Sequence, residues 1–161
     1  TFVATVGSIV TAGAKPVFVD VKEDYNMDET KIEKAITKKT KALMPVHWAG
    51  RPCEMDKIKK IAKKYNLKII QDSAHIIGAK FKNNYLVNYG DTCTYSMHPL
   101  KNLNVWGDGG FIVTNNKILN KAKYTNNTDE WYTDYKTVEE ELKHYQHHFE
   151  GKAVLCNCDD P

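Results

Sequence analysis

The sequence contains few cysteines and no long apolar run. Four of its 161 residues are cysteine, and apart from Cys156 and Cys158 they lie far apart, which favours reduced thiols over a disulfide framework. No apolar stretch approaches the roughly 18 residues of a membrane span. No basic start followed by an apolar block marks a signal peptide. These absences argue against a disulfide scaffold and a membrane protein, and we expect a cytoplasmic location.

The composition is that of a globular chain: 42% of the residues are hydrophobic and 27% are charged. At 161 residues, we expect one ordinary core. Residues 1–123 contain 20 Lys plus Arg and 11 Asp plus Glu, a balance of +9, whereas residues 124–161 contain 3 and 9, a balance of −6. Such a break indicates a domain boundary near residue 123, although a solvated acidic helix would give the same signal.

Strand-like and helical patterns alternate along the chain. Helical spacing covers 27–36, with Asp28 as a possible cap, and 54–66, where one apolar stripe contains Met55, Ile58 and Ala62. The alternation predicts an α/β fold with a mostly parallel sheet covered on both faces. The strand-like segments are 15–21, 41–47, 67–72, 91–97 and 109–115.

One lysine stands in the apolar stretch YSMHPLKNLNVWGDGG, residues 95–110. Ligands of parallel sheets gather at the carboxyl ends of strands, where Asp72, Ser96 and Lys101 are expected. A neutral lysine amine can form a Schiff base, an aspartate can pair with a protonated pyridine nitrogen, and a serine can bind phosphate. Each also has a plainer interpretation: a helix cap, a solvated surface lysine and a serine bonded to backbone. The spacing of the three residues does not decide between the cofactor-binding roles and these plainer ones.

Five stretches resemble, in order and spacing, the DegT-type sugar aminotransferases. The resemblance covers about three quarters of the chain and implies a pyridoxal phosphate enzyme with the large domain of the aspartate aminotransferase fold. Its most specific part is the serine five residues before Lys101, followed by Gly-Asp-Gly-Gly. The stretches are TFVAT (1–5), GAKPVFVDV (13–21), MPVHWAGRPCEMD (44–56), QDSAHIIGA (71–79) and YSMHPLKNLNVWGDGGFIVTNN (95–116).

The resemblance assigns a role to five residues. It makes Lys101 the Schiff-base lysine and proton shuttle, and Asp72 the partner that keeps the pyridine nitrogen protonated. His75 would lie near the phenolic oxygen of the cofactor, and Ser96 would contact its phosphate. Phe2 would stack on the ring. Relatives that perform dehydration replace the lysine by histidine, so the retained lysine favours transamination.

Other residues carry weaker predictions. His47 could lie near the sugar substrate, or be a structural hydrogen-bonding residue at a strand end. His98 is expected to shape the lysine loop, and residues 107–110 to form tight turns rather than a phosphate-binding loop. The lysine-rich face of 57–68 is explained by a solvated amphipathic helix, so we expect no nucleic-acid partner except by analogy through the tail, residues 124–161.

The same resemblance implies the substrates and the assembly. A keto-sugar, nucleotide-linked, would receive the amino group of an amino acid such as glutamate. Family members are more than twice as long, so residues 1–123 are expected to form an incomplete large domain without the small C-terminal domain. Since the family builds its site between two subunits, we expect a homodimer in the full-length parent.

The tail contains, in order, DEWYT (129–133), EEELKHY (139–145), HFEGK (148–152) and CNCDDP (156–161). In these elements residues 124–161 resemble a different family, the start of EcoRI-type DNA adenine methyltransferases. We expect a helix over 136–149 and a strand over 152–156. Soft metal ligands also occur here, but without a usual zinc spacing, so no metal site is predicted. The alternative to a sugar aminotransferase is a chimeric or truncated chain without independent activity. The metal-ligand types are His144, His147, His148, Cys156 and Cys158.

Overall fold

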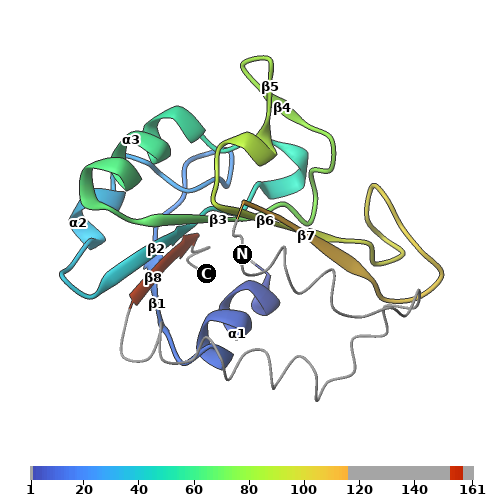
Figure 1. The fold of residues 1–161 in the computed structure, drawn as a ribbon, viewed down its shortest axis with the longest axis horizontal. Coiled ribbons are helices and arrows are strands. Elements are labelled where there is room, and N and C mark those ends of the chain that lie inside the picture. Colours follow the sequence, from blue (N-terminus) through green and yellow to red (C-terminus); the bar gives the residue numbers. More distant parts are fainter. Residues whose placement is uncertain (1, 116–152, 158–161) are drawn as a thin grey trace.

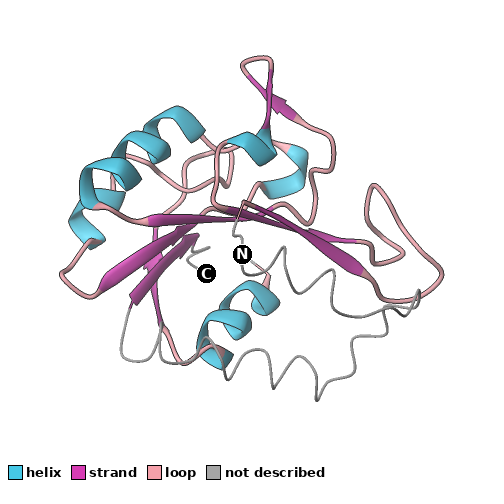
Figure 2. Cartoon of the chain, viewed as in Figure 1, coloured by secondary structure: helices cyan, strands magenta, loops and turns pink. Residues whose placement is uncertain are grey.

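The structure is a computed structural model that describes residues 2–115 together with the backbone of residues 153–157. Six strands form one sheet in the order β1-β8-β2-β3-β6-β7 (Figures 1 and 2). All neighbours are parallel except β6 and β7, which are joined by a loop that returns the chain directly and are antiparallel. The predicted α/β class with a mostly parallel sheet is therefore confirmed. The strands are β1 (Lys15–Val19), β2 (Thr40–Met44), β3 (Lys68–Asp72), β6 (Thr92–Ser96), β7 (Gly110–Thr114) and β8 (Ala153–Asn157).

Helices cover both faces of the sheet. Figure 1 shows α1 (Val3–Thr11) on one face and α2 (Ile32–Ala35) and α3 (Met55–Tyr65) on the other, beside a short hairpin of β4 (Lys80–Phe81) and β5 (Asn84–Tyr85). Two short 3₁₀ turns, η1 (Trp48–Gly50) and η2 (Leu86–Asn88), complete the connections. In the described part of the chain, no helix has the length and apolarity needed to cross a membrane.

Helix α3 follows its predicted boundaries because its apolar stripe meets the sheet. Met55, Ile58 and Ala62 are buried in the main core, which also contains Leu43 of β2 and Ile69 of β3. The helix ends at Asn66, whose left-handed backbone closes the last turn with hydrogen bonds to the carbonyls of Ala62 and Lys63. Burial of this stripe fixes the face of the helix that packs on the sheet.

The predicted helix over 27–36 is wrong for its first half. Only Ile32–Ala35 is helical, and its N-cap is Lys31 rather than Asp28. The Asp28 side chain instead accepts hydrogen bonds from the backbone N–H and the hydroxyl of Thr30. Aspartate in this position stabilises a turn, which competes with helix formation.

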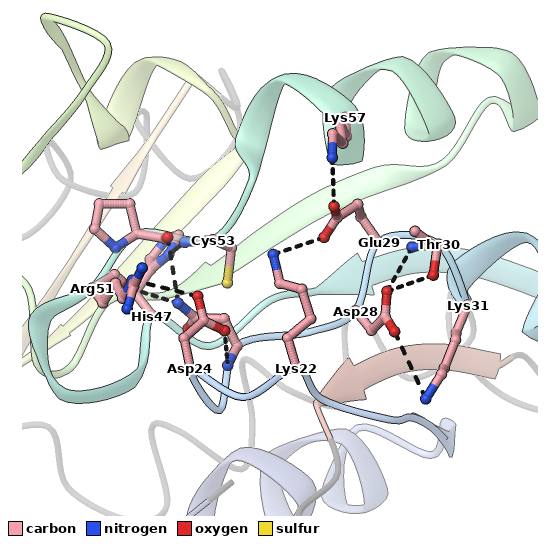
Figure 3. A network of polar contacts seen from close by, with 12 residues as sticks. Lys22, Asp24, Asp28, Glu29, Thr30, Lys31, His47, Arg51, Cys53 and Lys57 are labelled. Atoms are coloured by element: carbon pink, nitrogen blue, oxygen red, sulfur yellow. Dashed lines mark hydrogen bonds and ion pairs between the residues drawn. The ribbon is translucent and has the colours of Figure 1, made fainter.

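A buried carboxylate ties this turn region to helix α3. Glu29 is 7% exposed and receives Lys57 Nζ at 2.7 Å and Lys22 Nζ at 3.0 Å (Figure 3). Burial by itself would raise the pKa of Glu29, but the two ammonium groups outweigh it and lower that pKa to about 2. The ionised carboxylate therefore links the 22–31 segment to α3.

Replacing Glu29 by glutamine should lower the free energy of unfolding at neutral pH by about 2 kcal/mol, since two ammonium groups lose their partner. The native pKa is depressed, so the stabilisation is complete above the unfolded value of 4.5 and disappears as the pH falls toward about 2. In urea titrations, the difference in free energy of unfolding between wild type and Glu29→Gln should shrink as the pH is lowered from 4.5 toward about 2. Asp56→Asn, which breaks the exposed pair with Lys82, is the matched control and should change stability by less than about 0.5 kcal/mol. A constant difference at all pH values would contradict the ionic account.

The tail contributes a central strand. The strand predicted over 152–156 is confirmed within one residue as β8, which lies between β1 and β2 and is parallel to both. The predicted helix over 136–149 and the histidine-cysteine group of the tail lie outside the described residues and side chains.

Candidate active site

The carboxyl ends of two paired parallel strands bring the predicted residues to one edge of the sheet. Asp72 ends β3, Ser96 ends β6, and Lys101 lies in the loop that follows β6. Strands β3 and β6 are paired directly, with Asp72 opposite Thr94. Residues that are 29 positions apart in the sequence, such as Asp72 and Lys101, thereby reach the same end of the sheet.

The backbone of Asp72 is fixed by the neighbouring segment that follows β2. Its N–H donates to the Pro45 carbonyl at 2.9 Å, and its carbonyl accepts the N–H of His47 at 3.1 Å. Its side chain is held as well: Oδ1 accepts the N–H of Ala74 at 3.1 Å, and Oδ2 accepts the hydroxyl of Thr5 at 2.7 Å. The carboxylate is thus oriented by donors from two separate elements.

The lysine loop is closed at its base by backbone hydrogen bonds. The Met97 N–H donates to Gly109 at 2.7 Å, and the Val105 N–H donates to Met97 at 3.0 Å. Gly110 has no room for a side chain, because a Cβ there would lie 2.6 Å from the Tyr95 carbonyl oxygen. Gly107 has a φ of 141°, a value that favours glycine. The chain bends at Gly107, whose N–H donates to the Val105 carbonyl at 3.0 Å, whereas Gly110 is already the first residue of β7, so the prediction of tight turns over 107–110 is wrong at its C-terminal end.

His98 shapes the same loop, as predicted. Its N–H donates to Ser96 Oγ at 3.3 Å, its carbonyl accepts the N–H of Lys101 at 2.8 Å, and its ring Nδ1 accepts the N–H of Leu100. The backbone of Lys101 is therefore positioned by a residue three places earlier.

His75 provides an observation that bears on a ligand. Its Nδ1 is buried and has no hydrogen-bond partner among the described residues, although buried polar atoms in proteins nearly always have one. Burial lowers the pKa of His75, and the positive charge of Lys101 lowers it further. The ring also makes an edge contact with Trp48, with ring centres 5.6 Å apart. A neutral imidazole with an unsatisfied nitrogen fits a site that holds a polar ligand atom.

His47 has a different environment. It is fully buried, and both ring nitrogens are used within the protein: Nδ1 accepts the N–H of Cys53 at 3.1 Å, and Nε2 lies 3.0 Å from Gln71 Oε1. Since Nδ1 accepts, Nε2 carries the proton and donates to Gln71. Burial lowers the pKa of His47, which keeps the ring neutral. Of the two interpretations left open by the sequence, the geometry favours the structural one.

Phe2 precedes the helix that contains Thr5, and Ser96 is the last residue of the strand before the lysine loop. Phe2 is 67% exposed and occupies the N-cap of α1, the helix whose first turn contains Thr5. Ser96 ends β6 and is partly buried. The Phe2 side chain is exposed, and the Ser96 hydroxyl accepts the N–H of His98 at 3.3 Å.

Thr5 was given no role from the sequence, although it lies in the quoted TFVAT stretch. It is 4% exposed, and its hydroxyl is the donor to Asp72 across 67 residues of sequence. A threonine in the first turn of a helix is too common to stand out, and only its partner reveals it.

In the described ranges, no group of three or more metal-ligating side chains occurs.

The chain is similar to several curated proteins over most of its length. An uncharacterized protein of Methanocaldococcus jannaschii is 50% identical over 76% of this chain, and a pleiotropic regulatory protein of Geobacillus stearothermophilus is 49% identical over 74%. GDP-perosamine synthase of Escherichia coli O157:H7 is 43% identical over 74%. The chain spans about a third of the length of these relatives, 32%, 32% and 33% respectively.

Solved structures agree in fold. The aminotransferase of Psychrobacter cryohalolentis superposes with a TM-score of 0.71 at 39% identity, over 74% of this chain and 30% of that one. The NtdA protein of Bacillus subtilis, solved with the bound cofactor PMP, superposes with a TM-score of 0.69 at 38% identity, over 74% and 27%.

The sequence profile of the DegT/DnrJ/EryC1/StrS aminotransferase family matches residues 1–148. The match extends beyond residue 123 into the segment that also resembles the start of EcoRI-type methyltransferases, and both that second resemblance and the domain boundary stay predictions. With a match over most of its length, this chain belongs to the DegT/DnrJ/EryC1/StrS aminotransferase family.

Proposed function

We propose that this chain is part of a pyridoxal phosphate-dependent sugar aminotransferase. The observation that carries the proposal is the convergence of Asp72, His75 and the Lys101 loop at one sheet edge, in a chain of this aminotransferase family. The unsatisfied Nδ1 of His75 and the oriented carboxylate of Asp72 fit the cofactor.

Each residue then has a role. Lys101 attaches the cofactor and moves the proton at the substrate carbon, while Asp72 holds a proton on the ring nitrogen. His75 donates to or accepts from a polar ring substituent through its free nitrogen, Ser96 binds the phosphate with its hydroxyl, and Phe2 packs on the ring. Bound pyridoxal phosphate supplies the electron-withdrawing ring on which transamination depends.

The substrate part of the proposal draws on a relative. GDP-perosamine synthase carries in its name a nucleotide-linked sugar, which supports a nucleotide-linked keto-sugar as amino acceptor for this chain. An amino acid such as glutamate is the proposed donor. We keep a cytoplasmic location as part of the same proposal.

The assay that tests this function measures the transfer of the amino nitrogen from glutamate to the sugar. The chain, loaded with pyridoxal phosphate, is incubated with isotope-labelled glutamate and a GDP-linked keto-sugar, and the products are separated by mass spectrometry. Labelled nitrogen in the sugar is the expected result, dependent on the cofactor. If the cofactor is bound but no labelled nitrogen reaches the sugar, the sugar substrate is wrong.

A homodimer of the full-length parent protein belongs to the proposal. Large apolar side chains near the site are left exposed: Leu100 is 88% exposed, and Phe2 is 67% exposed. Trp106, in the lysine loop, is fully exposed. Exposed aromatic and aliphatic side chains of this kind are typical of surfaces that another chain covers. Sedimentation of the full-length parent as a monomer at all concentrations would contradict this part.

A further inference from the structure

We infer that Thr5 is a positioning residue that sets the orientation of Asp72 toward the ring nitrogen of the cofactor. The inference rests on the proposed function and extends it to a residue outside the predicted site. Its basis is the 2.7 Å hydrogen bond from the Thr5 hydroxyl to Asp72 Oδ2.

The bond is built from two elements that are fixed independently. Thr5 lies in the first turn of α1, where its N–H donates to the Phe2 carbonyl at 3.0 Å. Asp72 ends β3, with its backbone bonded on both sides to the segment 45–47. The side-chain torsions of Asp72 are the freedom that remains, and Thr5 and the N–H of Ala74 restrict them.

The hydrogen bond between Thr5 and Asp72 is shielded from water and has no competing cation among the described residues. Thr5 is 4% exposed, so water does not compete for its hydroxyl. Among residues 2–115, no lysine or arginine forms an ion pair with Asp72, and its two oxygens are held by neutral donors. Because no described cationic side chain pairs with this oriented carboxylate, it can form an ion pair with a protonated nitrogen of a ligand. Hydrogen bonds to charged groups are among the stronger ones in proteins.

The test compares two cofactors and three variants of the full chain. Thr5→Val keeps the shape and removes the hydroxyl, Thr5→Ser restores it, and Thr11→Val makes the same chemical change at an exposed site on the same helix. The ligands are pyridoxal phosphate and its deaza analogue, in which carbon replaces the ring nitrogen. Dissociation constants are measured by titration, with circular dichroism as a check of folding.

We expect Thr5→Val to weaken binding of pyridoxal phosphate about tenfold, the value of one hydrogen bond to a charged group. Thr5→Ser should stay within about twofold of wild type, and Thr11→Val should be unchanged. With the deaza analogue, Thr5→Val and wild type should bind alike, because the nitrogen on which Asp72 acts is absent. An equal loss with both cofactors, or no loss at all, would overturn the inference.

A double-mutant cycle with alanine in place of valine gives a second route should Thr5→Val fold poorly. In an Asp72→Asn background, replacing Thr5 by serine or alanine should have the same effect on cofactor affinity, since the carboxylate that Thr5 orients is gone. Different affinities in that background would mean that Thr5 acts elsewhere. Failure of the wild type to bind pyridoxal phosphate is a separate outcome that overturns the proposed function itself.

Discussion

Lys101→Ala abolishes covalent capture of pyridoxal phosphate by this chain. After incubation with the cofactor and reduction with borohydride, peptide mapping should place the label of the wild-type chain on Lys101 and find none at this position in the variant. The physical reason is position: only this lysine lies in the loop after β6, near His75, whose pKa its charge helps to lower. An amine at the site captures the aldehyde as an intramolecular partner, which is worth several orders of magnitude in effective concentration.

The control for this prediction is Lys38→Ala. Lys38 is exposed and precedes β2 at the opposite end of the sheet, so its loss should leave the label on Lys101 unchanged. Folding of Lys101→Ala should be intact, because the hydrogen bonds that place this residue in the loop involve its backbone. A label spread over surface lysines in the wild-type chain would show that residue 101 has no special reactivity, and the proposed function would lose its central residue.

Leu155→Pro unfolds the chain or lowers its free energy of unfolding by on the order of 3 kcal/mol. Residue 155 lies at the middle of β8, opposite Val17 of β1 and Leu43 of β2. A central strand has a partner on each side, so a proline here removes a ladder hydrogen bond and leaves a neighbouring carbonyl unpaired. Because β8 alone joins β1 to β2 among the described strands, loss of its pairing separates β1 from the rest of the sheet.

Leu155→Val is the matched control, since it keeps the backbone N–H and a residue type common in strands. Its midpoint in a urea titration should lie close to that of wild type, while that of Leu155→Pro should be strongly reduced. Hydrogen exchange would show where the damage lies: amides of Lys15–Val19 should lose protection before those of Lys68–Asp72. Equal stability of the proline and valine variants would contradict the central position of β8.

Local pattern determined most of the elements. The apolar stripe of α3 and the strands β2 and β3 follow from residue periodicity, because each of them buries apolar residues at the positions that its sequence pattern predicts. The helix expected over 27–36 failed where Asp28 has a local alternative, a turn stabilised by its own side chain. Periodicity alone does not weigh such competing hydrogen bonds.

For the candidate site too, some residues were predicted from the sequence, whereas the role of others became clear only from their neighbours in the structure. The resemblance to the DegT-type aminotransferases, rather than spacing alone, predicted Asp72, His75, Ser96 and Lys101 as one group, and the strand ends bring Asp72, Ser96 and the Lys101 loop to one edge of the sheet. The two open interpretations of His47 were separated only by its partners, Cys53 and Gln71, which fill both ring nitrogens. A histidine beside a strand looks the same in either role until its neighbours are known.

The sequence by itself determined the family and the alternation of strands and helices, and it predicted a set of candidate site residues. Only the tertiary structure decided that Thr5 meets Asp72 and that residues 153–157 lie between β1 and β2. Both contacts join segments distant in the chain, the first over 67 residues. Local propensity acts over a few residues, whereas long-range pairing depends on which surfaces meet when the sheet closes, and no spacing along the chain encodes that directly.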